Sequence, residues 1–113
     1  MSGRGAAAET VAAAFLERKG LEIIVRNYRC RLGEIDLIAR DGATTVFIEV
    51  RQRTSSAFGG AAASITAAKK QRLLKAARHY LSRLRVTPAC RFDALLIDGD
   101  PPNIAWVRDA FGE

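Results

Sequence analysis

The sequence predicts one α/β domain, built from a mixed β-sheet with helices on its faces. The 113 residues amount to a single domain, and because 49% of them are apolar they can bury one core without disulfides or a structural metal. Their patterns follow the order helix, three strands, long helix, two strands, which is typical of a sheet flanked by helices. The whole chain, residues 1–113, is therefore expected to form one domain.

The first two expected elements are a helix and a strand. Residues 6–19, AAAETVAAAFLERK, contain mostly helix formers, with Val11 and Phe15 on an apolar face, and Gly20 follows as a C-cap. Residues 21–30, LEIIVRNYRC, are rich in β-branched and aromatic side chains, which favours a strand. A short connection then leads into the next segment.

Residues 33–53, GEIDLIARDGATTVFIEVRQR, predict a β-hairpin. Its turn is expected at Asp41–Thr44, because Asp-Gly between apolar runs is a strong hairpin signal. When a two-residue loop closes this hairpin, Asp36 lies directly opposite Glu49. A slip by one residue would move one of these acids to the other face, so the register decides whether they meet.

The two faces of this hairpin differ in polarity. One face is wholly apolar and is expected to be core; it carries Ile35, Leu37, Ala39, Val46, Ile48 and Val50. The other face passes from apolar to charged, with Ile38 opposite Phe47, then Asp36 opposite Glu49, then Glu34 opposite Arg51. The charged end is a candidate functional site.

The rest of the chain predicts a loop, a long helix and two strands. Serines and a glycine pair indicate a loop over residues 53–63, and apolar residues at helical spacing predict a helix over 65–84, with Ser64 or Thr66 as its N-cap. The last two strands, around a proline-containing turn, are expected over residues 90–98 and 103–111.

The opposed acids Asp36 and Glu49 are expected to repel each other, which opposes folding. Their Cβ atoms would lie about 5 Å apart, and two carboxylates at this distance repel by roughly 3 kcal/mol at an effective dielectric of about 20. A divalent cation such as Mg²⁺ would offset the repulsion, because it takes carboxylate oxygens together with water and phosphate. Two alternatives stay open: Arg51 or Arg53 neutralises the pair, or one acid points to solvent.

The second expected helix is basic. Between residues 65 and 85 it has no acid and carries Lys69, Lys70, Arg72, Lys75, Arg78, Arg83 and Arg85. Like charges three residues apart mildly destabilise a helix, and a polyanion would relieve this repulsion. Together with the net charge of +6, this favours a nucleic-acid partner. A solvated helix face is the other explanation.

No segment of the sequence is expected to enter a membrane. The apolar runs fall short of the ~20 residues that span a bilayer, and Glu9 interrupts the early alanines, so a signal peptide is not expected. Cys30 and Cys90 are far apart and suit free thiols in a reducing compartment. The expected location is the cytoplasm.

The segments GEIDLIARDG, VFIEVRQR, AFGGAAASIT and KKQRLLKAARHYL, in this order, resemble the YraN family of bacterial proteins. That family is similar in pattern to the PD-(D/E)xK nucleases and to archaeal-type Holliday-junction resolvases. The resemblance covers nearly the whole chain and implies a restriction-endonuclease-like fold of three layers, with a central mixed sheet between helices. It also implies a Mg²⁺ or Mn²⁺ site at Asp36 and Glu49, with Glu9 of the first helix binding the metal directly or through water.

One residue departs from the nuclease pattern. Arg51 stands where the superfamily most often has lysine. Because arginine stays protonated, Arg51 could hold a phosphate or stabilise the transition state but could not act as a general base. Arg51 could also pair with Glu34, its expected cross-strand neighbour.

These observations lead to rival hypotheses. The first is a metal-dependent endonuclease for branched or structured DNA, which would act as a symmetric homodimer if it is a resolvase. Its catalytic residues would be Glu9, Asp36, Glu49 and Arg51, and its nucleic-acid contacts Arg53, Lys69, Lys70, Arg72 and Lys75. The second is a nucleic-acid-binding protein with the same fold and no turnover, which Arg51 favours. The third is an interaction protein whose basic helix binds an acidic protein.

Overall fold

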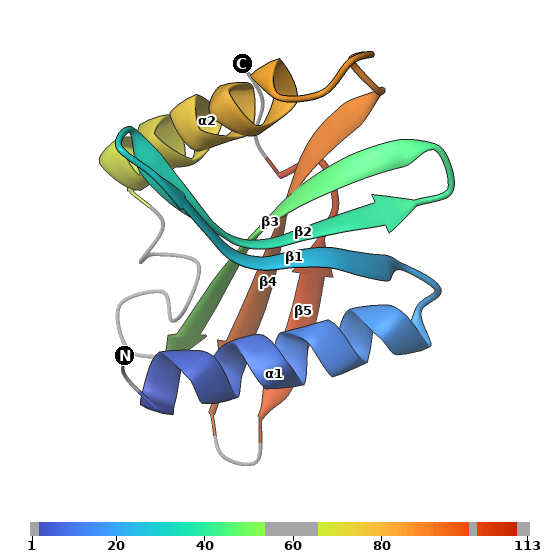
Figure 1. Cartoon of the computed structure of the whole chain (residues 1–113). Helices are drawn as coiled ribbons and strands as arrows, with labels where there is room; N and C mark the ends of the chain where they lie inside the picture. The colour runs from blue at the N-terminus through green and yellow to red at the C-terminus, as the bar shows by residue number, and fades with distance from the viewer. Residues whose placement is uncertain (1–2, 54–65, 100–101, 111–113) are drawn as a thin grey trace.

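The structure is a computed structural model, and it describes residues 3–53, 66–99 and 102–110. Within these ranges the elements follow the predicted order of a helix, three strands, a helix and two strands (Figure 1). The elements are α1 Gly3–Arg18, β1 Glu22–Cys30, β2 Gly33–Asp41, β3 Thr44–Arg53, α2 Ala67–Ser82, β4 Cys90–Asp98 and β5 Asn103–Val107. Neither helix is long and apolar enough to cross a bilayer.

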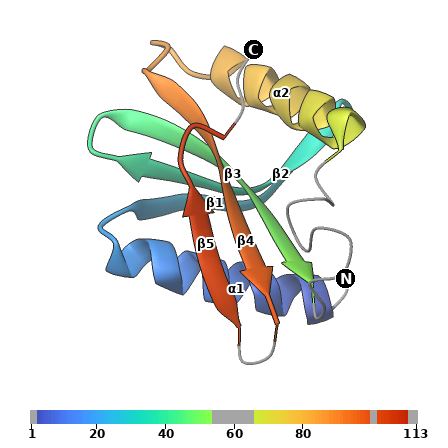
Figure 2. The ribbon, with the colours of Figure 1, turned by 180° about the vertical axis from the view of Figure 1, so that it is seen from behind.

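The strands form one five-stranded sheet in the order β1-β2-β3-β4-β5. All neighbours are antiparallel except β3 and β4, which are parallel. A parallel pair needs a crossover connection, and α2 lies within it. The two helices cover opposite faces of the sheet, as Figures 1 and 2 show. The predicted α/β class with a mixed central sheet is confirmed, and the three layers are consistent with a nuclease-like domain.

The core under α1 contains most of the hairpin face that the sequence assigns to the interior. Leu37, Ala39, Val46, Ile48 and Val50 are buried there, together with helix residues and side chains of β4. The small residues Ala12 and Ala13 let α1 lie close to the sheet, because they add little side-chain volume at the contact.

The core under α2 is more aromatic and contains Ile35, which the sequence analysis placed on the other face. That placement was wrong. The hairpin of β1 and β2 bends: its register is irregular between Ile23 and Val25, and Asn27 has a left-handed backbone with φ of 56°. The bend turns the distal part of the hairpin toward α2, so Ile35 packs with Leu73 and other residues of the α2 cluster.

The ends of the helices explain their lengths. Gly20, with φ of 97°, closes α1 as predicted, since its N–H bonds the Glu17 carbonyl and the Leu21 N–H bonds the Leu16 carbonyl, which is a Schellman arrangement. Thr66 is the N-cap of α2, where its hydroxyl accepts from the Lys69 N–H at 3.3 Å.

Several boundaries differ from the prediction: α1 spans residues 3–18 rather than 6–19, α2 spans residues 67–82 rather than 65–84, and β1 begins at Glu22 rather than at Leu21. The last strand ends at Val107, because the chain turns at Asp109, which has φ of 53°, so the expected extension to residue 111 was wrong. Arg53 ends β3, as the predicted hairpin over residues 33–53 has it, so the loop expected from residue 53 begins one residue too early. The remainder of that expected loop, residues 54–63, lies outside the described ranges.

The predicted turn and register of the β2–β3 hairpin are confirmed from Asp41↔Thr44 to Leu37↔Ile48. Gly42 has φ of 61°, as the first loop residue of a two-residue hairpin turn requires. The prediction that Asp36 pairs directly with Glu49 was wrong, because the ladder between β2 and β3 ends at Leu37↔Ile48. Beyond this point β3 continues alongside β4, while β2 continues alongside β1.

Candidate functional site

The two predicted acids, Asp36 and Glu49, lie where β2 and β3 separate, and they meet through side-chain contacts instead of strand pairing. The Val50 N–H donates to Asp36 Oδ2 at 2.8 Å, so a carboxylate takes the place of a ladder partner for β3. The carboxyl group of Glu49 is hydrogen-bonded to that of Asp36. The two acids therefore form one site, held by a side chain rather than by direct strand pairing.

Arg51 neutralises this site in part. Its Nη1 lies 3.1 Å from Glu49 Oε2, and both residues project from the same face of β3 because they are two positions apart. The side chains are only 26% and 12% exposed, so this ion pair is shielded from water. Glu34, the other acid expected as a partner of Arg51, pairs with Arg29 at 3.5 Å.

Burial raises the pKa of both acids. The pKa of Glu49 rises to about 8, first because its carboxylate is desolvated and then because Asp36 lies beside it, with Arg51 opposing the shift. Burial also raises the pKa of Asp36, against the lowering effects of the Val50 N–H, the hydrogen bond from Glu49 and the charge of Arg51. At neutral pH Glu49 therefore stays protonated, and its carboxyl O–H donates a hydrogen bond to the Asp36 carboxylate.

Glu9 of α1 contacts the acid pair through Asp36. Its pKa is raised by partial burial and then by the charge of Asp36, to which it is hydrogen-bonded. The carboxyl groups of Glu9 and Glu49 thus each contact Asp36. Within residues 3–53, 66–99 and 102–110, however, no group of three or more His, Cys, Asp or Glu is placed to hold a metal ion. The preformed donor set is the pair Asp36 and Glu49.

A small cleft of about 60 Å³ opens over this pair. Its lining combines three acids with three basic side chains: Glu34, Asp36, Glu49, Arg51, Lys69 and Arg72. The volume admits an ion with one or two waters, because a water in the liquid occupies about 30 Å³. The acids come from the hairpin, and Lys69 and Arg72 come from α2, so the basic helix and the acid pair share one site.

The other predicted basic residues lie outside the cleft lining. Lys70 and Lys75 are on α2, where Lys70 is half-buried and Lys75 is exposed. Arg53 ends β3, and its side chain is outside the described part of the structure. The sequence offered Lys69 as a contact for flanking nucleic acid and missed its place beside the acids. That place follows from the β3–α2–β4 crossover, which the local pattern does not reveal.

A second buried acid, Asp93 of β4, was not singled out from the sequence. It is 0% exposed and accepts from Arg91 Nε at 3.1 and 3.2 Å, from Trp106 Nε1 at 2.9 Å and from the Asp109 N–H at 2.9 Å. Arg91 also contacts Asp41 at 3.0 Å. These contacts join β4, β5 and the residues after β5, so Asp93 has a structural role.

Comparison with known proteins identifies the family. The model of the uncharacterised protein family UPF0102 matches residues 8–97, which include the acid pair, Glu9, Arg51 and all of α2. This chain belongs to the UPF0102 family. The family-level expectation from the sequence, under the name YraN, is thereby confirmed.

Relatives of the family match along almost their full length. A UPF0102 protein of Nitrosomonas europaea is 57% identical over 111 residues, which cover 97% of this chain and 94% of that protein. One of Nitrosospira multiformis is 54% identical over 109 residues, covering 96% and 92%. One of Cupriavidus taiwanensis is 56% identical over 110 residues, covering 96% and 82%. Since these names state a family and no activity, the function must be argued from the site.

Proposed function

We propose that this UPF0102 protein is a metal-dependent endonuclease that hydrolyses phosphodiester bonds of branched or structured DNA. The observation that supports this best is the buried pair Asp36 and Glu49 at the floor of a cleft whose wall is the basic helix α2. A buried acid pair opposes folding unless something compensates its charge. The same cleft offers hard oxygen donors beside side chains that bind phosphate.

The donor set fits one divalent cation. Asp36 and Glu49 would hold it, with water and phosphate oxygens as the other ligands, because Mg²⁺ is commonly bound by one or two carboxylates. Glu9, which contacts Asp36, would act through water. Bound Mg²⁺ or Mn²⁺ would supply a more acidic water and a positive charge against the phosphodiester.

Proton release from Glu49 controls this site. With a pKa of about 8, Glu49 carries a proton at neutral pH in the place where a cation would bind. Both carboxyl groups must be ionised to bind a hard cation, so affinity for Mn²⁺ rises as pH rises toward 8. Arg51 limits the cost of ionisation, because its guanidinium already lies 3.1 Å from Glu49.

The basic side chains of the cleft would orient the phosphate. Arg51 stays charged and can donate to a phosphate oxygen, but it cannot take a proton from water. Lys69 brings an ammonium group from α2 into the cleft, so the site contains a lysine although β3 carries arginine at the usual position. Arg72 contributes a second guanidinium on the same side.

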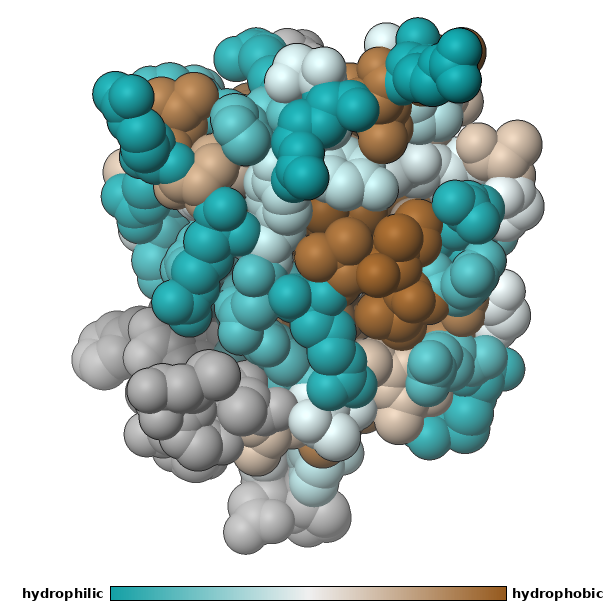
Figure 3. Space-filling model, in the orientation of Figure 1, coloured by the Kyte–Doolittle hydropathy of each residue, from teal (hydrophilic) through white to brown (hydrophobic). Residues whose placement is uncertain are grey.

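Contacts with flanking phosphates would extend along the molecule. Lys70, Lys75 and Arg53 would bind the backbone without reading its sequence, so affinity would fall steeply with added salt. Figure 3 shows hydrophilic side chains around α2 and the hairpin end, with the broadest apolar area of that face lying between the two helices. Cys30 and Cys90 form no disulfide within the described part of the chain, which suits a reducing compartment and supports the expectation of a cytoplasmic protein.

A second candidate function is a nucleic-acid-binding protein that has this fold but does not cleave. The ion pair between Arg51 and Glu49 favours it, because a guanidinium on Glu49 satisfies part of the charge that a cation would otherwise compensate. In that case the acid pair and Arg51 would form a closed structural unit, and α2 alone would bind nucleic acid.

Cleavage and calorimetry separate the two candidates. Junction, flap and single-stranded DNA are incubated with Mg²⁺ or Mn²⁺, and Mn²⁺ binding is titrated at pH 6 and at about pH 8. The nuclease proposal expects cleavage, and Mn²⁺ binding that is lost in Asp36→Asn and Glu49→Gln. The exposed acid Glu17 provides the matched control, Glu17→Gln. Wild-type protein that binds DNA but neither binds Mn²⁺ nor cuts any substrate would favour the second candidate. Sedimentation with and without junction DNA would show whether the active species is a homodimer.

A further inference from the structure

The tip of the β1–β2 hairpin is fixed against α2. A Cβ atom at Gly33 would overlap the Arg72 carbonyl, so only glycine allows this approach. On the same side, the Tyr28 hydroxyl and His79 Nδ1 share a hydrogen bond across the junction. The turn residues Arg31 and Leu32 are therefore held at a defined place beside the helix.

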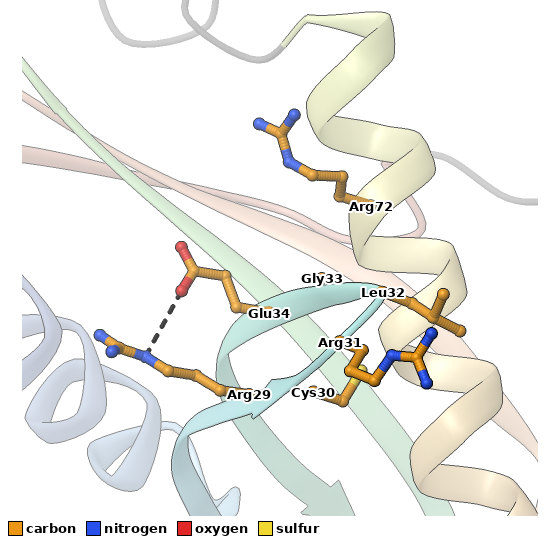
Figure 4. A pocket seen from close by; sticks show the side chains of 7 residues that line it. All are labelled: Arg29, Cys30, Arg31, Leu32, Gly33, Glu34 and Arg72. Carbon is orange, nitrogen blue, oxygen red and sulfur yellow. Dashed lines mark ion pairs between the residues drawn. The ribbon is translucent and has the colours of Figure 1, made fainter.

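Two hollows lie on either side of Leu32. The first, of about 270 Å³, is shown in Figure 4, where Arg29 and Glu34 of the hairpin lie on the side that Arg72 of α2 faces, while the side chains of Arg31 and Leu32 extend on the other side of the hairpin tip. The second, of about 330 Å³, is lined by Arg31, Leu32 and His79. Leu32 belongs to both linings and is 51% exposed, so it forms an apolar ridge between them.

The hollows and the acid cleft share lining residues. Glu34 and Arg72 line both the cleft and the first hollow, and Arg31 and Leu32 line both hollows. A row of depressions therefore runs from the acid pair along α2 and around the hairpin tip. Such a row has the shape required by an extended chain rather than by a small ligand.

The charged residues that line this row of hollows favour a chain that carries phosphate groups. The first hollow has three arginines and one glutamate in its lining, and Arg29 pairs with that glutamate at 3.5 Å. Guanidinium groups are suited to phosphate, which they can bind with two parallel hydrogen bonds. Between two such hollows, an exposed leucine offers an apolar surface to the face of a base.

We propose that this row is the path of one nucleic-acid strand that leaves the acid cleft, with Arg72 and Arg31 on phosphates and Leu32 against a base. The proposal rests on the nucleic-acid binding in the proposed function and does not need cleavage. Because stacked duplex hides the faces of its bases, Leu32 reaches a base only where stacking is interrupted. The path therefore predicts tighter binding to DNA with unpaired nucleotides than to a blunt duplex.

The test is binding by fluorescence anisotropy in EDTA, which prevents metal-dependent cleavage. One probe is a labelled duplex with a single-stranded extension, and the other is the same duplex with blunt ends. Leu32→Ser is expected to weaken binding to the extended probe about fivefold and to the blunt probe less than twofold. Arg31→Ala is expected to weaken binding about five- to tenfold and to reduce the slope of log K against log salt by about one.

Matched controls are available at exposed positions away from the row. Val107→Ser changes an apolar residue on β5, and Arg40→Ala removes an arginine at the opposite end of the hairpin, where it pairs with Glu22. Both should bind as wild type does. All four variants alter exposed side chains, so their melting temperatures should stay within about 3 °C of wild type.

The outcomes distinguish the path from the nuclease proposal. Wild-type affinity in both Leu32→Ser and Arg31→Ala would overturn the path, even if the protein cleaves DNA. Failure of the wild type to bind either probe, or binding that does not respond to salt, would also overturn it. Protein that binds as expected but cuts nothing with Mn²⁺ would end the nuclease proposal and leave the path supported.

Discussion

Two buried acid sites in the same sheet differ in how their charge is satisfied. Asp93 accepts hydrogen bonds from two side chains and one backbone N–H, and each of its oxygens has a donor. Asp36 accepts from the Val50 N–H, and Glu49 accepts from Arg51. The other contacts that these acids make here are with carboxyl groups. Burial alone therefore does not distinguish a functional acid from a structural one.

The difference lies in what compensates the charge. Around Asp93 the protein itself supplies the donors, so the site is complete and closed. Around Asp36 and Glu49 a proton takes that place at neutral pH, as the pKa of about 8 for Glu49 indicates. A proton can be exchanged for another cation, and the proposed metal site depends on this property, which the structural contacts of Asp93 do not share.

The largest predicted effect of a single substitution is the loss of stability at Asp93. Asp93→Ala removes the fully buried carboxylate that accepts from Arg91, Trp106 and the Asp109 N–H, and leaves Arg91 with Asp41 as its carboxylate partner, so the free energy of unfolding should fall by about 3–5 kcal/mol. Urea denaturation measures this loss. The loss should be the same with and without Mn²⁺, and a loss below about 1 kcal/mol would contradict the structural role.

The second prediction concerns activity at the acid pair. Asp36→Asn and Glu49→Gln should each reduce cleavage by at least about a hundredfold, or roughly 2.7 kcal/mol in the barrier. The variants should stay folded, because an amide keeps the volume of the carboxyl group. Cleavage of a labelled junction or flap, with Glu17→Gln as the control, is the measurement. Undiminished cleavage in both variants would place the active site elsewhere.

The third prediction concerns pH. In the folded protein the pKa of Glu49 is raised from 4.5 to about 8, so between these values the folded state holds a proton that the unfolded state has lost. The metal-free protein is therefore most stable below about pH 4.5 with respect to this group, and loses stability as pH rises through about 8. The slope should reach at most about 1.4 kcal/mol per pH unit.

Glu49→Gln tests this linkage directly. The variant should show a flatter dependence of unfolding free energy on pH between 5 and about 8, and a melting temperature about 5 °C above wild type at the upper end, where wild type must ionise the buried acid. Added Mn²⁺ should raise the melting temperature of wild type and leave that of the variant unchanged. Identical pH profiles for the two proteins would contradict the raised pKa.

The fourth prediction concerns the contact between the hairpin and α2. Gly33→Ala places a methyl group against the Arg72 carbonyl, so one of the two elements must move, at a cost of about 1–3 kcal/mol. Thermal or urea unfolding measures the cost. The neighbouring exposed variant Arg31→Ala should change stability by less than about 0.5 kcal/mol. Equal effects of the two variants would contradict the close approach.

The smallest expected effect separates two lysines on one helix. Lys69 lines the acid cleft and Lys75 does not, so Lys69→Ala should reduce cleavage about five- to tenfold and Lys75→Ala less than twofold. In binding assays without metal, both should reduce the salt dependence similarly, because each removes about one phosphate contact. Equal losses of cleavage would mean that Lys69 acts only as a general backbone contact.

Much of the fold could be predicted because its signals are local. The Asp-Gly turn determined the hairpin register, and the spacing of Leu73, Leu74 and Ala77 indicated the buried face of α2. The failures arose from non-local geometry. The bend at Asn27 moved Ile35 to the other core, and separation of β2 from β3 replaced the expected Asp36↔Glu49 pairing with a side-chain contact.

The candidate site shows the same division. Both acids were identified because a charge in an apolar strand is conspicuous, but Asp93, in the equally apolar CRFDALLID, has that signal too. Only the donors around each acid distinguish the two sites, and those come from other elements. The place of Lys69 likewise depends on the parallel pairing of β3 with β4, which brings the start of α2 over the acids.

The hydrogen bond from the Val50 N–H to Asp36 affects how relatives of this chain should be compared. The Val50 N–H lies beyond the last β2–β3 pair, Leu37↔Ile48, and the Asp36 carboxylate accepts its hydrogen bond. Asp36 therefore helps to complete the sheet whether or not the protein cleaves DNA. A family member that had lost its activity would still benefit from an aspartate there. Within the described ranges the contacts of Glu49 are with the side chains of Asp36 and Arg51, and Glu49 is costly to ionise, so its presence in a relative is the better diagnostic of a working site.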